Sequence, residues 1–148
     1  MKPNIIKILS ALILSCTTLI GCSTAQNDIP DDASLVIMGN VNQVIGWLES
    51  DIRVMETVDV KATNNSGQVE TYTGVPLRFL LDTAGVKPEA ISVQIQTADG
   101  LSADAPLSDV MSCEDCILTF RNKGGFSIVA PGLGKDFQLK GVVKIQVK

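Results

Sequence analysis

The amino-acid sequence predicts an α+β fold, a single mixed-sheet domain with two or three short helices. Short segments with alternating apolar residues recur along the chain, and turns rich in Asn and Gly join several of them as hairpins. Apolar residues at helical spacing occur only in brief stretches. Strands joined by hairpins and interrupted by a few helices are typical of the α+β class, not of a regular βαβ array.

The first 21 residues predict a lipoprotein signal peptide. Lys2 and Lys7 precede an apolar run from Ile8 to Ile20 that is shorter than the roughly 20 residues of a membrane-spanning helix. The run ends in Leu19-Ile20-Gly21-Cys22, a lipobox with a small residue before the cysteine. Cys22 is therefore the predicted lipidation site, with simple secretion as the alternative. We expect an extracytoplasmic lipoprotein, anchored in a membrane of the cell envelope through lipid on Cys22.

Residues 22–34 are predicted to form the lipid anchor and a polar tether, and residues 35–148 the folded domain. The tether contains Asn, Asp, Gln and Pro and has little apolar surface to bury. The remaining 114 or so residues are about one domain long.

Charge and composition exclude several classes of function. The chain has 12 basic and 16 acidic residues, and removing residues 1–21 takes away Lys2 and Lys7, which leaves 10 basic residues and a formal charge of −6. The basic residues are spaced singly among acids, so nucleic acid is not an expected partner. No histidine occurs in the sequence. Catalysis by a Ser-His-Asp or Cys-His group, and zinc sites built on histidine, are therefore excluded.

The first half of the domain alternates short strands and a helix. Leu35–Met38 is an apolar run of strand length, and the spacing from Leu48 to Met55 is closer to a short helix. Thr57–Thr63 alternates apolar and charged residues, which predicts a strand with one exposed face. Asn64-Asn65-Ser66-Gly67 is a turn sequence that allows Val69–Thr73 to return as the partner strand.

The second half begins with the best-defined helix. Leu77–Ala84 has leucines at helical spacing, Pro76 at its start and Gly85 just beyond its end, as helices prefer. Two hairpins and a final strand follow. Strands are expected over Ser92–Thr97, Leu101–Ala105, Cys116–Arg121, Phe126–Val129 and Val142–Val147.

Several separated motifs resemble the molybdopterin-binding domain of the sulfite oxidase family. They are the segment from Tyr72 to Val86, which contains Thr-Gly-Val-Pro-Leu and a leucine-rich helix, then Ala98-Asp99-Gly100, Ile128-Val129-Ala130-Pro131-Gly132, and Lys140 five residues before Ile145. The order and spacing agree with the family over about Leu35 to Lys148. The resemblance implies the mixed-sheet fold of that domain and, in members that use it, a molybdopterin cofactor.

The residues that this family uses at its cofactor are mostly absent. Members that bind molybdenum do so through a cysteine shortly after the strand that here ends near Thr63, where this chain has Asn64 and Asn65. No cysteine lies between Cys22 and Cys113, and carboxamides are poor substitutes for a soft sulfur ligand. The family's histidine contacts to the cofactor phosphate and its arginine near the metal also have no match.

Lys140 alone occupies a position that resembles a cofactor-contacting residue, and a solvated lysine at the start of a strand is the favoured alternative. No metal site and no cofactor is therefore expected, with molybdopterin kept as the less favoured alternative.

Cys113-Glu114-Asp115-Cys116 is the second group with possible chemistry. The Cys-x-x-Cys spacing is that of redox dithiols, and an exported protein meets oxidising conditions. The two central acids disfavour a thiolate, so a structural disulfide is preferred. Redox exchange through Cys113 and Cys116, or metal binding and free thiols, remain as alternatives.

Two classes of function follow from the sequence. The preferred one is a lipid-anchored extracytoplasmic module with a sulfite-oxidase-like fold that has lost the molybdenum ligand and binds a protein or small ligand without catalysis. The alternative is a redox protein, which acts either by thiol-disulfide exchange or as a molybdopterin-binding oxidoreductase domain.

Overall fold

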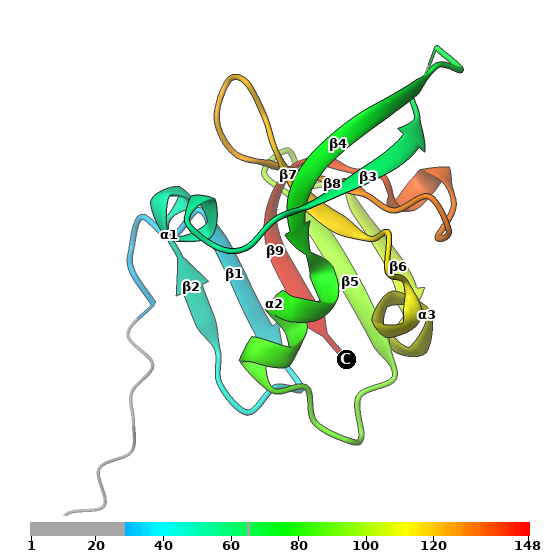
Figure 1. Cartoon of the computed structure of the whole chain (residues 1–148). Helices are drawn as coiled ribbons and strands as arrows, with labels where there is room; N and C mark the ends of the chain where they lie inside the picture. Colours follow the sequence, from blue (N-terminus) through cyan, green and yellow to red (C-terminus); the bar gives the residue numbers. More distant parts are fainter. Residues whose placement is uncertain (1–28, 65) are drawn as a thin grey trace, which may run out of the picture.

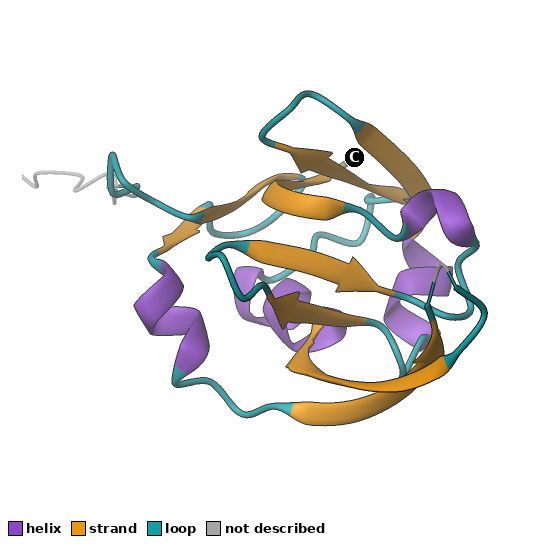
Figure 2. Ribbon diagram, turned by 90° about the horizontal axis from the view of Figure 1, so that it is seen from above, coloured by secondary structure: helices purple, strands orange, loops and turns teal. Residues whose placement is uncertain are grey.

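The computed structural model describes residues 29–64 and 66–148, and the domain it contains is one curved mixed sheet with short helices (Figures 1 and 2). The predicted fold class is confirmed. The strands are β1 (Leu35–Gly39), β2 (Ile45–Trp47), β3 (Val58–Thr63), β4 (Val69–Pro76), β5 (Ser92–Thr97), β6 (Ser102–Pro106), β7 (Ile117–Phe120), β8 (Phe126–Val129) and β9 (Lys140–Val147). The helices are α1 (Glu49–Arg53), α2 (Leu77–Ala84), α3 (Leu107–Ser112) and the 3-10 turn η1 (Lys135–Phe137).

Strand β9 holds the sheet together. The strands lie in the order β2-β1-β9-β8-β7-β4-β3, and the β5–β6 hairpin branches off β9. Pairing of β1 with β9 is parallel and all other pairs are antiparallel, which makes the sheet mixed. The register shifts between Gln96 and Thr97 and between Phe126 and Ser127. Such irregularities bend strands, and the sheet is strongly curved when seen from above (Figure 2).

The main hydrophobic core lies between the sheet and helix α2. Leu77, Leu80, Leu81 and Ala84 of this helix are at most 1% exposed. The helix begins after Pro76 and ends at Gly85, whose φ of 68° and N–H bonds to the Leu81 and Asp82 carbonyls close the last turn. The helix that the sequence predicted between Pro76 and Gly85 is therefore confirmed.

A second, smaller cluster lies on the other face of the sheet. Neighbouring residues of β7 divide between the clusters, since Ile117 belongs to the small cluster and Leu118 to the main core. The small cluster also contains Val60 and Ala62 of β3 and Val129 of β8, with Tyr72 packed against it. Strands β4, β7 and β8 thus have apolar side chains on both faces, whereas β3 contributes apolar side chains on one face only.

Three elements were not located by the sequence. Strand β2 is only three residues long, helix α3 has six residues, and η1 has three, so none has a periodic pattern long enough to detect. Strand β4 continues through Gly74 to Pro76, beyond the predicted end at Thr73, because Gly74–Pro76 pair with β7. Within the described residues, none of the helices is long and apolar enough to cross a membrane.

Candidate functional site

A large cleft opens on the face of the sheet that carries the smaller cluster. Its volume is about 1180 Å³, and its walls come from the β3–β4 hairpin, the β7–β8 turn and the segment between β8 and β9. In Figure 1 the hairpin extends away from the body of the domain, with the β7–β8 turn on one side and η1 on the other. A cavity of this size can hold a cofactor-sized molecule.

The floor of the cleft combines a polar row with an apolar patch. Thr119, Ser127 and Lys140 are successive partners across β7, β8 and β9 and all line the cleft, so the row runs from the half-buried Thr119 and Ser127 on the floor to the exposed Lys140 at the rim. The Thr119 hydroxyl donates to the Thr73 carbonyl at 2.9 Å, which fixes one end of the row. Beside the row, Ala62, Val129 and Tyr72 supply apolar surface. A ligand with both a flat apolar part and polar groups would match this floor.

The rim of the cleft is strongly basic. Four of its lining residues are cationic and one is acidic, namely Arg121, Lys123, Lys135, Lys140 and, as the acid, Glu70. All four cations are exposed, and among the described residues none forms a salt bridge. A local cluster of unpaired cations in a protein with a formal net charge of −4 is an electrostatic site for an anion.

Arg121 reaches from the end of β7 towards the start of β9. Its Nη1 atom would lie 3.4 Å from a Cβ added to Gly141, the residue after Lys140. Gly141 has a φ of 78°, which favours glycine, and its lack of a side chain leaves room for the guanidinium. The pKa of Asp99 is lowered, chiefly by the hydroxyl of Thr97 that donates to it, and in smaller part by the charge of Arg121.

The acidic end of the cleft is organised by Asn64. Its Nδ2 donates to Glu70 Oε1 at 2.8 Å, while its Oδ1 accepts from the amides of Ser66 and Gln68 at 2.9 and 3.0 Å. The Tyr72 hydroxyl donates to the other oxygen of Glu70 at 3.0 Å. Burial raises the pKa of Tyr72, and Glu70 raises it further, so the phenol is neutral. Asn64 is thus committed to shaping the hairpin turn, an ordinary role for this residue type.

The residues of the cleft fit part of a molybdopterin cofactor. The cationic rim suits a phosphate, and the floor suits a ring. Asn64 and Asn65 stand in the segment where the family resemblance implies a cysteine ligand; of the two, Asn64 has its side chain bonded within the turn, and Asn65 lies outside the described residues. Among the described residues, His, Cys, Asp and Glu side chains nowhere form a group of three or more that could hold a metal ion. The side chains described in the cleft therefore fit the phosphate and the ring of the cofactor, but they include no thiolate that could hold a metal.

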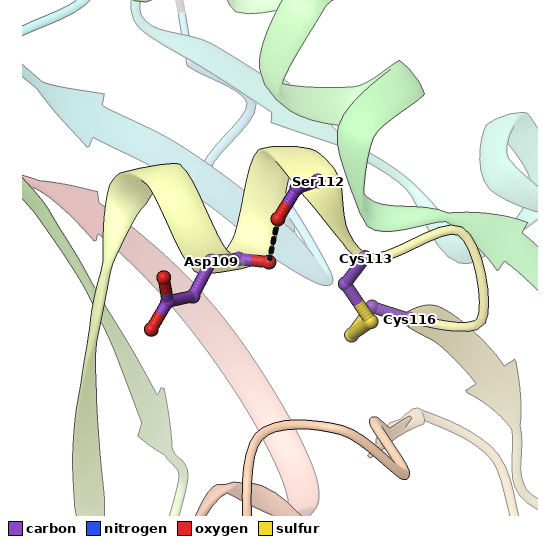
Figure 3. Close-up of a disulfide and its surroundings, with 4 residues drawn as sticks. All are labelled: Asp109, Ser112, Cys113 and Cys116. Atoms are coloured by element: carbon purple, nitrogen blue, oxygen red, sulfur yellow. Dashed lines mark hydrogen bonds between the residues drawn. A yellow bond between two sulfur atoms is a disulfide. The ribbon is translucent and has the colours of Figure 1, made fainter.

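Cys113 and Cys116 form a disulfide at a different place in the fold (Figure 3). The bond links the end of α3 to the start of β7, and Cys116 is fully buried while Cys113 is half-buried. Cys113 lines a shallow hollow of about 280 Å³ together with Asp109, Ser112, Gly132 and Leu133. These sulfurs do not line the cleft, so they cannot replace the missing ligand there.

The structure brings together residues that the sequence left apart. Of the predicted site residues, Lys140 lies in the cleft, Cys113 and Cys116 lie elsewhere, and Cys22 lies outside the described residues. The basic residues are spaced singly along the sequence, but the β7–β8 turn, η1 and the start of β9 bring Arg121, Lys123, Lys135 and Lys140 to one cleft. The missed signal was the concentration of basic residues after position 120, next to glycines that mark turns.

The fold is a mixed sheet that carries a cofactor-sized cleft with a basic rim on one face, an arrangement suited to binding a small anionic ligand. The comparison with protein families matches residues 23–126 to the oxidoreductase molybdopterin binding domain. The chain therefore belongs to that family. The match stops before η1 and β9, so it does not include Lys135 and Lys140.

Among solved structures, the chain is similar to the sulfane dehydrogenase SoxCD from Paracoccus pantotrophus. The similarity has a TM-score of 0.65 and 23% sequence identity, and it covers 76% of this chain but 37% of the SoxCD chain. At this identity the likeness establishes the fold alone. The comparison with curated proteins found no match.

Proposed function

We propose that this chain is a ligand-binding module of the molybdopterin-binding oxidoreductase fold, which takes a phosphate-bearing small molecule in its basic cleft and holds no metal through a thiolate of its own. The observation that carries the proposal is the gathering of four exposed cations around a cleft of about 1180 Å³. Charge-assisted hydrogen bonds from Lys and Arg to phosphate oxygens are strong and suit an open rim.

Membership of the family favours a molybdopterin-class cofactor as the ligand over a module without any cofactor. Arg121, Lys123, Lys135 and Lys140 are the residues that would contact its phosphate, and the floor at Tyr72 and Val129 would contact its ring. Because Asn64 and Asn65 stand where the family resemblance implies a thiolate ligand, the proposal includes no redox step through a metal. An unrelated phosphate ester of similar size has the same chemistry and is the second possible source of the ligand.

The test is to purify the full chain in detergent from a host that makes molybdopterin, and to measure bound pterin by fluorescence after oxidation and molybdenum by mass spectrometry. Stoichiometric pterin without molybdenum is the expected result. Stoichiometric molybdenum would overturn the claim about the metal. If pterin is absent, titration of the same protein with pyrophosphate decides whether the cleft binds phosphate at all.

Substitution of one rim cation ties binding to the cleft. Lys140→Gln is expected to weaken pyrophosphate binding about tenfold, because a hydrogen bond to a charged group is worth about 1.5 kcal/mol or more. Lys61→Gln is the matched control, since Lys61 is an exposed lysine of β3 that does not line the cleft. Equal effects of the two changes would mean that the anion binds through overall charge and not in the cleft.

The cellular localisation of the protein is a separate part of the proposal. Cys22, in the lipobox, would carry the lipid, residues 22–34 would act as the tether, and the domain would then lie on the extracytoplasmic side of a membrane of the cell envelope. A protein in that compartment would be a further binding partner. Nucleic acid would not be a partner. Cys22→Ser should abolish labelling by a radioactive fatty acid; labelling that persists would refute the lipidation site.

A further inference from the structure

Helix α1 contacts the β7–β8 turn across a long stretch of sequence. Glu49 is the first residue of the helix, and its Oε2 accepts a hydrogen bond of 2.9 Å from the amide of Gly125, 76 positions later. The turn is otherwise closed by its own backbone: the Arg121 amide donates to the Gly125 carbonyl and the Gly124 amide to the Arg121 carbonyl, both at 3.0 Å. Glu49 thus ties a turn that contains two glycines to a helix.

A second contact joins the same two elements. Arg53, one helical turn after Glu49, donates to Glu49 Oε1 from Nε at 2.9 Å and from Nη2 at 2.5 Å. The central carbon of its guanidinium lies 4.7 Å from the centroid of the Phe120 ring. Phe120 directly precedes Arg121, and its ring packs at a tilt against Phe126 with centroids 6.1 Å apart. Glu49 therefore fixes one end of the turn, and Arg53 fixes the residue that precedes the other end.

We propose that Glu49 and Arg53 are positioning residues for the cleft, which hold the β7–β8 turn so that Arg121 and Lys123 face the anion. Neither residue lines the cleft itself, whereas Phe120, Arg121, Asn122 and Lys123 all do. The inference rests on the proposed function, because it concerns the affinity of that cleft for a phosphate.

We call the contacts of Glu49 with Gly125 and of Arg53 with Phe120 the clamp. The β7–β8 turn needs such a clamp because it carries two like charges and two conformationally free glycines. Arg121 and Lys123 carry like charges on a short turn, and their repulsion favours arrangements in which they separate before an anion is bound. Gly124 and Gly125 both have positive φ and place few limits on the backbone. If only a fraction of molecules held the turn in the competent arrangement, the apparent dissociation constant would rise by the inverse of that fraction. The clamp keeps this fraction high.

Glu49→Gln separates positioning from simple electrostatics by the sign of its effect. Removal of a negative charge near a basic cleft should tighten anion binding if charge alone mattered. Loss of the clamp predicts the opposite, a dissociation constant for pyrophosphate that is 5- to 10-fold higher. Glu56→Gln is the control, because Glu56 is an exposed acid shortly after the same helix and lines no part of the cleft. Its change gives the effect of charge alone.

The experiment measures two quantities on the full chain in detergent, namely pyrophosphate affinity by calorimetry and hydrogen exchange of the segment 120–126 without any anion. In Glu49→Gln we expect weaker binding and faster exchange in this segment, with an unchanged slope of affinity against salt, because the bound state keeps all its cations. Arg53→Gln should act in the same direction on exchange, and it serves as the second variant if Glu49→Gln folds poorly.

The outcomes distinguish this inference from the proposed function. If the wild type binds pyrophosphate and Glu49→Gln binds it equally or more tightly, the positioning role is overturned. If the wild type does not bind pyrophosphate but the segment 120–126 exchanges faster in Glu49→Gln, the proposed ligand is wrong and the clamp on the turn is supported. Unchanged exchange in both variants overturns the clamp whatever the affinity.

Discussion

The two faces of this sheet are built on different principles. The face under α2 is closed by apolar side chains, and its leucines at positions 77, 80 and 81 are at most 1% exposed. The opposite face carries a cluster of only four buried residues, and beyond it a cleft lined by polar and charged groups. The first face supplies stability, and the second has little apolar surface to lose. The comparison teaches that residues of the cleft can change chemically without loss of the fold.

The largest expected difference between the faces is in their response to truncation. Leu80→Ala on the α2 side should lower the free energy of unfolding by about 2 to 5 kcal/mol, because a fully buried leucine leaves a cavity. Val60→Ala, in the small cluster and 3% exposed, should cost about 1.5 kcal/mol. Urea unfolding of both variants measures the difference, and similar losses would refute the contrast between the faces.

The sequence predicted the helix-covered face better than the cleft. The periodic leucines of α2 and its Pro and Gly boundaries are local signals, so the helix could be placed without knowledge of the fold. The cleft is assembled from the β3–β4 hairpin, the β7–β8 turn and the segment around η1, which meet only through strand pairing. Lys140 was identified from the family resemblance, whereas Arg121, Lys123 and Lys135 have no periodic pattern that would reveal a common face.

The next largest expected effect on stability comes from loss of the disulfide between Cys113 and Cys116, which should leave binding in the cleft unchanged. It closes a loop of four residues, and for so short a loop chain entropy gives a stabilisation of about 2 kcal/mol. Cys113→Ala should therefore lower the unfolding free energy by about that amount and remove any response of the melting temperature to dithiothreitol. Pyrophosphate binding should be unchanged, because the pair does not line the cleft. A large loss of affinity in this variant would mean that the two faces are coupled through the segment between β8 and β9.

Gly141 follows the cleft residue Lys140 in β9 but does not itself line the cleft, so its substitution tests whether backbone strain beside the cleft disturbs anion binding. Its φ of 78° is strained for any other residue, so Gly141→Ala should cost about 1 kcal/mol or somewhat more. The new Cβ would lie 3.4 Å from Nη1 of Arg121, a van der Waals contact that the flexible arginine side chain can accommodate. We expect a small loss of stability, measured by urea unfolding, with little change in pyrophosphate affinity. Gly100→Ala is the control, since Gly100 also has positive φ, would place its Cβ in open space and does not line the cleft. A several-fold loss of affinity in Gly141→Ala but not in Gly100→Ala would contradict this and show that the position of Arg121 depends on Gly141.

The smallest expected effect is the pH dependence of the contribution that Glu49 makes to the free energy of unfolding. The amide of Gly125, and then the hydrogen bond from Arg53, lower the pKa of Glu49 below its ordinary value of 4.5. The unfolded chain therefore binds a proton at higher pH than the folded chain does, and the stabilisation from Glu49 is present above about pH 4.5 and lost as the pH falls through the lower folded pKa.

Glu49→Gln removes this one contribution and leaves those of Asp99 and Asp104, whose pKa values are also lowered. The stability of the wild type should exceed that of the variant by less than about 1 kcal/mol near neutral pH, as for partly exposed ion pairs, and the gap should narrow on acidification. Urea unfolding of both proteins between pH 3 and 7 measures the gap. A gap that stays constant over this range would mean that the negative charge of Glu49 does not stabilise the contact between α1 and the β7–β8 turn, which would then depend on interactions that do not titrate, such as the packing of Arg53 on Phe120.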